Sequence, residues 1–294
     1  MQVIDAHHHL WRQADLPWLQ GPMQPRIFGE YAAIMRDYPV EEYVADATSS
    51  GVVKSIYVQA NWAAGQGLAE ARWVQAVAGR AEFPQAIVAH ADLSSPDAPA
   101  DLRALCALES VRGIRQQMHW HENPLYRFAS RPDLMNDAAW RRGFGELAPR
   151  GLLFELQIFA AQMDDGARLA ADFPETIIVL EHAGMLEDRS AQGMLQWRRG
   201  MRLLAACPNV HVKLSGLGTF VREASARTMR PVVQETLSMF GPQRCLFGSN
   251  FPIEKLWCGY AELFAAFLAS IDGLGAQERA AVLHDNAARL YRIQ

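Results

Sequence analysis

The chain has 294 residues, of which 50% are hydrophobic and 20% charged, with a formal net charge of −4. That length suits one α/β barrel, and the apolar half of the chain is enough for a large core. The sequence has no Lys/Arg-rich run, no apolar run as long as a membrane span and no N-terminus typical of a signal peptide, so we expect neither nucleic-acid nor membrane binding.

Short apolar runs rich in β-branched residues recur along the chain and predict eight strands. They cover residues 2–9, 53–60, 86–92, 112–117, 152–158, 176–182, 209–215 and 244–249. Between them, apolar residues at helical spacing predict helices. The clearest cover 68–80, 98–110, 196–207 and 228–240, with a closing helix at about 276–291. Pro231 fits best in the first turn of its helix.

Eight strands alternating with helices predict an α/β fold, a (β/α)8 TIM barrel with a parallel sheet. An open doubly wound sheet is the alternative, but it usually carries a glycine-rich loop after its first strand, and here that strand ends in histidines. We expect residues 1–294 to form a single domain. The long loop excursion at about 11–39 follows the first strand, which places it over the C-terminal face of a barrel.

Polar side chains follow each predicted strand where it ends. In chain order they are His7 and His9, Gln59 and Asn61, His90 and Asp92, Arg115 and Gln117, Glu155 and Gln157, Glu181 and His182, Lys213 and Ser215, and Ser249 and Asn250. The ends of parallel strands meet at one mouth, and polar groups are costly to bury unpaired, so this ring predicts a site. Because strand side chains alternate, His7 and His9 share one face and His8 points away. Cys245 is expected in the core, and His211 and His284 as hydrogen-bonded loop anchors.

These residues resemble the amidohydrolase superfamily. The segments that carry the resemblance are IDAHHHLW (4–11), YVQANW (57–62), GIRQ (113–116), FELQI (154–158), LEHAG (180–184), VKLSGL (212–217) and LFGSNFP (246–252). They are most similar to its metal-optional branch, amidohydrolase 2, which includes sugar-acid lactonases and pyrone dicarboxylate lactonase. The resemblance implies a hydrolase of a small lactone or carboxylic ester acting at the barrel mouth.

The resemblance also implies roles for the residues at the strand ends. His7, His9 and His182 would line a metal or substrate site, and Arg115 would take a carboxylate or the lactone carbonyl. Our predicted catalytic residues are His182, Asn250 and Arg115. Our predicted substrate-binding residues are His7, His9, Gln59, Asn61, His90, Gln157 and Lys213.

Two departures from the family pattern bear on the mechanism. Gln157 stands where metal-dependent members have a histidine, and Asn250 where nearly all members have an aspartate. An amide has no charge and no titratable proton, so Asn250 is excluded as a general base. His182 is the preferred base, because an unpaired imidazole titrates near neutrality, and Asp92, Glu155 and Glu181 rank below it.

The same departures leave the three histidines with no carboxylate to share a metal. We therefore expect either no cofactor or a weakly held divalent metal such as zinc on His7, His9 and His182. Chelation should then leave the activity nearly unchanged, and Asn250→Asp should raise the affinity for metal.

Two other function classes stay open from the sequence. A decarboxylase or other carbon–carbon lyase would need a firmly bound metal, and a ligand-binding barrel that lost its chemistry would account for Asn250. We expect a small-molecule substrate, no nucleic acid and no membrane; the oligomeric state is not predicted. The four cysteines have no CxxC spacing and indicate the reducing cytoplasm.

Overall fold

A computed structural model of the protein describes residues 1–293, so Gln294, the last residue of the predicted domain, lies outside the described residues. Eight strands form one sheet in the order β1 to β8, and every neighbouring pair is parallel. The strands are β1 Val3–His8, β2 Val52–Val58, β3 Ala86–Ala89, β4 Val111–Arg115, β5 Leu153–Leu156, β6 Ile178–Leu180, β7 Val210–Leu214 and β8 Cys245–Phe247.

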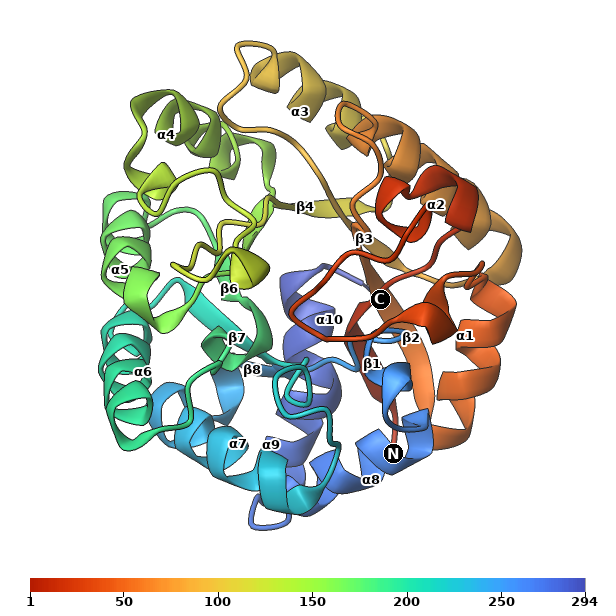
Figure 1. Ribbon diagram of the computed structural model, residues 1–294, viewed down its shortest axis with the longest axis vertical. Coiled ribbons are helices and arrows are strands. Elements are labelled where there is room, and N and C mark those ends of the chain that lie inside the picture. Colours follow the sequence, from red (N-terminus) through yellow and green to blue (C-terminus); the bar gives the residue numbers. More distant parts are fainter. Residues whose placement is uncertain (294) are drawn as a thin grey trace.

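A helix follows each strand and packs on the outside of the sheet (Figure 1). These helices are α1 Val40–Ala47, α2 Gly67–Ala81, α3 Ala98–Cys106, α4 Ala138–Gly145, α5 Met163–Asp172, α6 Ala191–Ala205, α7 Ala226–Phe240 and α8 Tyr260–Ser270. The predicted (β/α)8 barrel is therefore confirmed. No helix within residues 1–293 is both long and apolar enough to span a bilayer.

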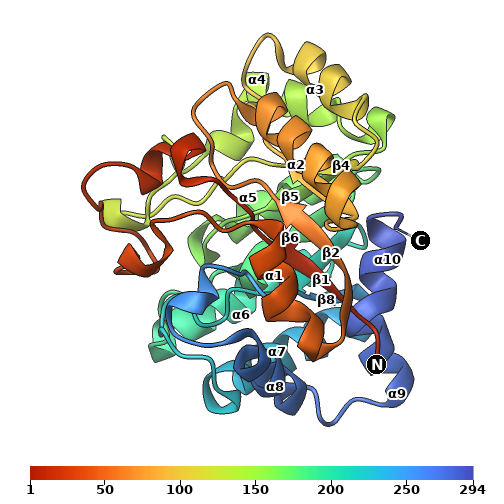
Figure 2. The ribbon, with the colours of Figure 1, turned by 90° about the vertical axis from the view of Figure 1, so that its right-hand side faces the viewer.

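The closing helix lies where the sequence predicts it. It runs through α9 Ala276–Ala280, a π-helical turn Ala281–Asp285 and α10 Asn286–Leu290. Its residues Ala287, Leu290 and Tyr291 pack with the apolar side chains inside the barrel. In Figure 2 this helix and the excursion after β1 lie on opposite sides of the barrel. The closing helix thus seals the end of the barrel away from the strand termini that carry the polar ring.

The structure corrects several element boundaries. The predicted strands 86–92 and 176–182 end at Ala89 and Leu180, because the polar residues beyond them leave the sheet. Asn61, His182 and Asn250 all have positive φ angles, of 62°, 55° and 59°. Left-handed backbone of this kind is costly for a non-glycine residue and clusters at functional sites.

The prediction that Pro231 lies in a first helical turn is wrong. The hydroxyl of Ser225 accepts a hydrogen bond from the Thr228 amide at 3.3 Å and caps the helix, so α7 begins at Ala226. Pro231 therefore lies in the second turn. The cap was a readable signal, since Ser is a preferred N-cap residue.

The excursion at 11–39 folds back on itself over the strand ends. Trp11 and Tyr38 exchange both backbone hydrogen bonds, at 3.0 and 2.9 Å, and so close its base. Three short 3-10 turns, Gln13–Asp15, Pro17–Leu19 and Ala32–Ile34, form the segment between them. Its side chains form part of the wall of the cavity described below.

The seam between β1 and β8 depends on the buried carboxylate of Asp5. One oxygen accepts the backbone amides of His7 and Ser249, at 3.1 and 2.8 Å. The other accepts the hydroxyls of Ser249, Tyr43 and Tyr260, at 2.6, 3.0 and 3.0 Å. Burial raises the pKa of Asp5, and the hydrogen bonds from Ser249 and His7 oppose that rise. This carboxylate joins the two edge strands to helices α1 and α8.

We predict that Asp5→Ala lowers the free energy of unfolding by about 3 kcal/mol, because two buried amides and three hydroxyls lose their acceptor. Urea unfolding followed by circular dichroism measures the change. Asp101→Ala, on the exposed face of α3, is the matched control and should change stability by less than about 0.5 kcal/mol. A loss below about 1 kcal/mol for Asp5→Ala would show that the seam does not depend on this carboxylate.

Candidate active site

One cavity opens at the C-terminal ends of the strands, with a volume of roughly 860 Å³ when its open mouth is included. Six of the predicted site residues line it, namely His9, Asn61, Arg115, Gln157, His182 and Asn250. They come from six different strand ends, which the barrel brings to one place.

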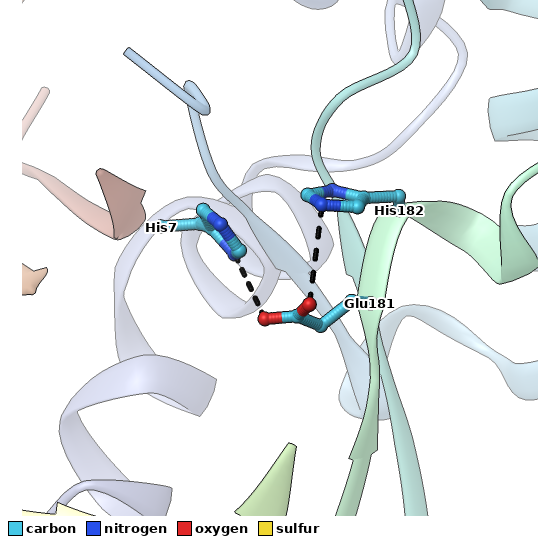
Figure 3. Close-up of side chains that lie close together, drawn as sticks. All are labelled: His7, Glu181 and His182. Carbon is cyan, nitrogen blue, oxygen red and sulfur yellow. Dashed lines mark ion pairs between the residues drawn. The ribbon is translucent and has the colours of Figure 1, made fainter. Parts of the chain in front are cut away.

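His7 lies directly behind this wall and is fully buried. Its ring centroid is 5.1 Å from that of His9 and 4.7 Å from that of His182. Its Nδ1 lies 3.4 Å from a carboxylate oxygen of Glu181, as Figure 3 shows. Within residues 1–293 neither ring nitrogen of His7 has a hydrogen-bond partner, which is rare for a buried polar group and marks the site as unsatisfied.

His9 is held in one tautomer. Its Nδ1 is 2.7 Å from the carbonyl oxygen of Val58, which can only accept, so Nδ1 carries the proton and Nε2 has a free lone pair. Burial and the charge of Arg115 lower the pKa of His9 to about 3. A neutral imidazole with an unprotonated Nε2 therefore lines the cavity at physiological pH.

His182 is a second imidazole that lines the cavity. Its Nδ1 is 2.9 Å from the hydroxyl of Ser215, and its Nε2 is 3.9 Å from Glu181. A side chain at Gly216 would place its Cβ 2.6 Å from Nδ1, so only glycine leaves room for this ring. Burial and the charge of Arg115 lower the pKa of His182 to about 3. The expectation that this imidazole titrates near neutrality is wrong, because it is buried beside a cation.

Glu181 is the residue that the sequence reasoning undervalued. It is fully buried, and one of its oxygens lies 3.1 Å from the guanidinium of Arg115. The expectation that no carboxylate stands among the histidines is therefore wrong. The signal was present, since Glu181 precedes His182 at a strand end. The left-handed backbone at His182 aims both side chains inward, and strand alternation does not predict that.

Arg115 is held by three strand ends. Besides Glu181, it donates to the backbone oxygen of Gln59 at 2.5 Å and to the side-chain oxygen of Gln157 at 3.4 Å. Its Nε is buried with no acceptor among the described residues. Because Arg115 lines the cavity, its guanidinium can face a ligand oxygen there.

Besides His7, three predicted substrate-binding residues do not line the cavity. The side chain of Gln59 is buried and accepts the Asn61 amide at 2.7 Å. His90 lies against Gly67, the first residue of α2. Lys213 is fully buried deeper in the barrel, with its Nζ 2.5 Å from Glu155. Its burial is possible because Glu155 neutralises it, a partner that the sequence does not identify.

His8 points away from the cavity, in agreement with strand alternation. Its ring stacks on Tyr43 of α1 with 3.8 Å between centroids. Sequence reasoning missed most of the cavity wall outside the strand ends. This wall is largely aromatic and comes from loops, namely Trp11, Trp18, Phe28, Phe128 and Phe220. Loop side chains have no register by which a sequence could place them.

Glu254 is a buried carboxyl group behind the cavity wall. Thr219 and Trp257 donate to it at 3.3 and 2.9 Å. Burial raises its pKa to about 8, although hydrogen bonds from Trp257, Thr219 and Asn250 lower it. The side chain is therefore mostly protonated and neutral at pH 7.

This pKa has a consequence for stability. Because the folded value of about 8 lies above the usual 4.5, the native protein keeps a proton that the unfolded chain has lost. The stabilisation of the folded protein by this proton is complete below pH 4.5 and is lost as the pH rises to 8. Replacing Glu254 with glutamine removes this titration.

We predict that the stability of Glu254→Gln relative to the native protein rises by roughly 4 kcal/mol between pH 5 and pH 8.5. Urea unfolding at a series of pH values measures the difference. Glu262→Gln, on the exposed face of α8, is the control and should show no such trend. A constant difference across this range would mean that Glu254 is ionised in the native protein.

Comparisons with known proteins agree with this geometry. The family model described as "Amidohydrolase" matches residues 4–293. The chain is 38% identical to an uncharacterized protein, y4mH, of Sinorhizobium fredii, over 99% of this chain and 98% of that one. It is 30% identical to an L-fucono-1,5-lactonase of Burkholderia ambifaria, over 99% of this chain and 95% of the relative. A crystal structure of a Burkholderia multivorans amidohydrolase with bound zinc covers all of both chains, with a TM-score of 0.83 and 27% identity. The sequence, the barrel and the histidine cluster together show that the chain belongs to the amidohydrolase 2 family.

Proposed function

We propose that the protein hydrolyses a small lactone by attack of water at the mouth of the barrel. The observation that carries this proposal is the pair His9 and His182, two neutral imidazoles that line one cavity beside the guanidinium of Arg115. Proton acceptors next to a hydrogen-bond donor suit ester hydrolysis. The similarity to L-fucono-1,5-lactonases supports the same reaction class.

In this proposal His182 takes the proton of the attacking water at Nε2. Its low pKa makes it a weak base in the resting site. As the carbonyl is attacked, however, the new oxyanion favours the charged imidazolium, and Glu181 at 3.9 Å favours it further. The guanidinium of Arg115, which lines the cavity, stabilises the oxyanion. When the oxyanion collapses, the ring C–O bond breaks and the imidazolium of His182 returns its proton to the leaving alkoxide. Asn250 and His9 orient the water, and Asn61 and Gln157 contact the substrate.

Zinc fits the donor atoms of this site. His7, Glu181 and His182 each offer one ligand atom, and these atoms all lie within 4.8 Å of one another. When bound, zinc would polarise the carbonyl and acidify water. The surrounding charge opposes it, because Arg115 already pairs with Glu181, and Lys213 and Arg115 both act on His7. We therefore propose a weakly held divalent metal that the reaction does not require.

The substrate is a small molecule in this proposal, since the cavity suits one. We also propose a cytoplasmic location. Cys106, Cys207, Cys245 and Cys258 are all free thiols, which a reducing compartment preserves.

We predict that His182→Ala lowers kcat at least about 100-fold on the best lactone of a sugar-acid panel, because it removes the proton acceptor. Acid release followed with a pH indicator gives the rate. His284→Ala, in the closing helix, is the control and should keep kcat within about twofold, since His284 does not line the cavity. No turnover of any lactone by the native protein, or full turnover by His182→Ala, would overturn the proposal.

We predict that zinc binds the native protein reversibly and is removed by dialysis. Glu181→Gln should weaken the affinity for zinc about 10-fold or more, because it removes an anionic ligand. Asn250→Asp should strengthen the affinity, because it adds one. Isothermal titration with zinc measures both. Zinc that survives chelator treatment in stoichiometric amount, or activity that chelation abolishes, would contradict a metal-optional site and favour the lyase alternative.

A further inference from the structure

The cavity wall has an unbalanced charge. Three arginines line it, Arg26, Arg115 and Arg127, and no aspartate or glutamate does so among the described residues. A cluster of cations without carboxylates attracts anions and focuses their approach into a cleft. The three arginines differ, however, in how far the protein itself satisfies them.

Two of the three are held by protein groups. Arg115 pairs with Glu181 at 3.1 Å, so its charge is balanced within the protein. Arg127 stands at the exposed rim and lies 4.8 Å over the ring of Trp120. It donates to the backbone oxygens of His121 and Glu122 at 3.1 and 3.0 Å.

Arg26 has no such partner. Within residues 1–293 its side chain forms no ion pair, and its Nε is buried without an acceptor. Its guanidinium lies 5.5 Å from the ring centroid of Trp18. A guanidinium over an aromatic face keeps the N–H donors along its edge free, and these match the two oxygens of a carboxylate.

The indole of Trp18, over which the guanidinium of Arg26 lies, is held in place by other groups of the protein. The indole N–H of Trp18 donates to the backbone oxygen of Ala60 at 2.9 Å, which ties the excursion to the end of β2. Phe28 and Tyr31 pack around the indole with ring centroids 6.2 and 5.8 Å away. The excursion therefore holds the guanidinium at the cavity wall before any ligand binds, which lowers the entropy cost of binding.

We propose that Arg26 binds an anionic group, a carboxylate, on the ring of the substrate, so that the protein selects acidic lactones over neutral ones. This inference rests on the proposed lactone hydrolysis. The lactone carbonyl would lie at Arg115 and His182, and the carboxylate would lie against the excursion. A neutral polyhydroxylated lactone would leave the guanidinium of Arg26 without a charge partner.

The test compares two substrates that differ only in charge, a δ-lactone with a ring carboxylate and its primary carboxamide. The native protein should have at least 30-fold higher kcat/KM for the acid. Arg26→Gln should lose most of that preference through KM, while kcat/KM for the amide stays within threefold. Arg26→Lys should fall between them, because it keeps the charge and loses the planar fork.

Arg12→Gln is the matched control, because Arg12 belongs to the same excursion, pairs with Asp15 and does not line the cavity. It should leave both substrates unchanged. Equal kcat/KM for acid and amide in the native protein, or an equal loss on both substrates in Arg26→Gln, would overturn the inference while leaving lactone hydrolysis intact.

A binding measurement separates this inference from the proposed reaction. Isothermal titration with benzoate and benzamide reports on the anion site without turnover. Benzoate binding that Arg26→Gln weakens at least tenfold, with benzamide unaffected, would support the anion site even if no lactone is hydrolysed. Benzoate binding that is equal in the native protein and Arg26→Gln would overturn it.

Discussion

The site depends on the hydrogen bonds that the carboxylate of Asp5 accepts. A barrel has no free edge only if its last strand meets its first, and here that meeting involves residues 244 positions apart in sequence. Asp5 accepts hydrogen bonds from both sides of the seam, from His7 on β1 and from Ser249 just after β8. The amide of Asn250 then donates to His7 at 2.7 Å. The same contacts that close the fold therefore bring the histidine motif beside Asn250.

Below the cavity, each buried cation is paired with a buried carboxylate. Lys213 is neutralised by Glu155, which also accepts the hydroxyl of Tyr291 at 2.5 Å, and Arg115 is neutralised by Glu181. Burial raises the pKa of Glu155 to about 7, which the charge of Lys213 opposes. Burial, together with the charge of Arg115, lowers the pKa values of His9 and His182 and keeps both rings neutral, so each can act as a proton acceptor or metal ligand. One buried arrangement thus favours acid–base chemistry and disfavours tight metal binding.

Chemistry and selectivity come from different parts of the chain. The strand ends supply the imidazoles and Arg115, and the barrel fixes them regardless of the ligand. The excursion and the loops after β4 and β7 supply the aromatic wall and Arg26. Loops vary in sequence more than the elements that they connect, and binding residues often lie on them. We therefore expect substrate selectivity to depend on the excursion more than on the histidine motif.

The sequence by itself determined the alternation of strands and helices, and hence the barrel, because apolar periodicity is a local property. It also determined that His7 and His9 point inward and His8 outward, because side chains alternate along a strand with a period of two. Only the tertiary structure decided that Glu181 stands among the histidines, that Lys213 is sealed beneath the site by Glu155, and that His90 stays outside it. Those outcomes depend on left-handed turns and on partners from other strands. Only the tertiary structure likewise left Arg26 on the cavity wall without a carboxylate, because no local pattern fixes where a loop side chain finds its partner.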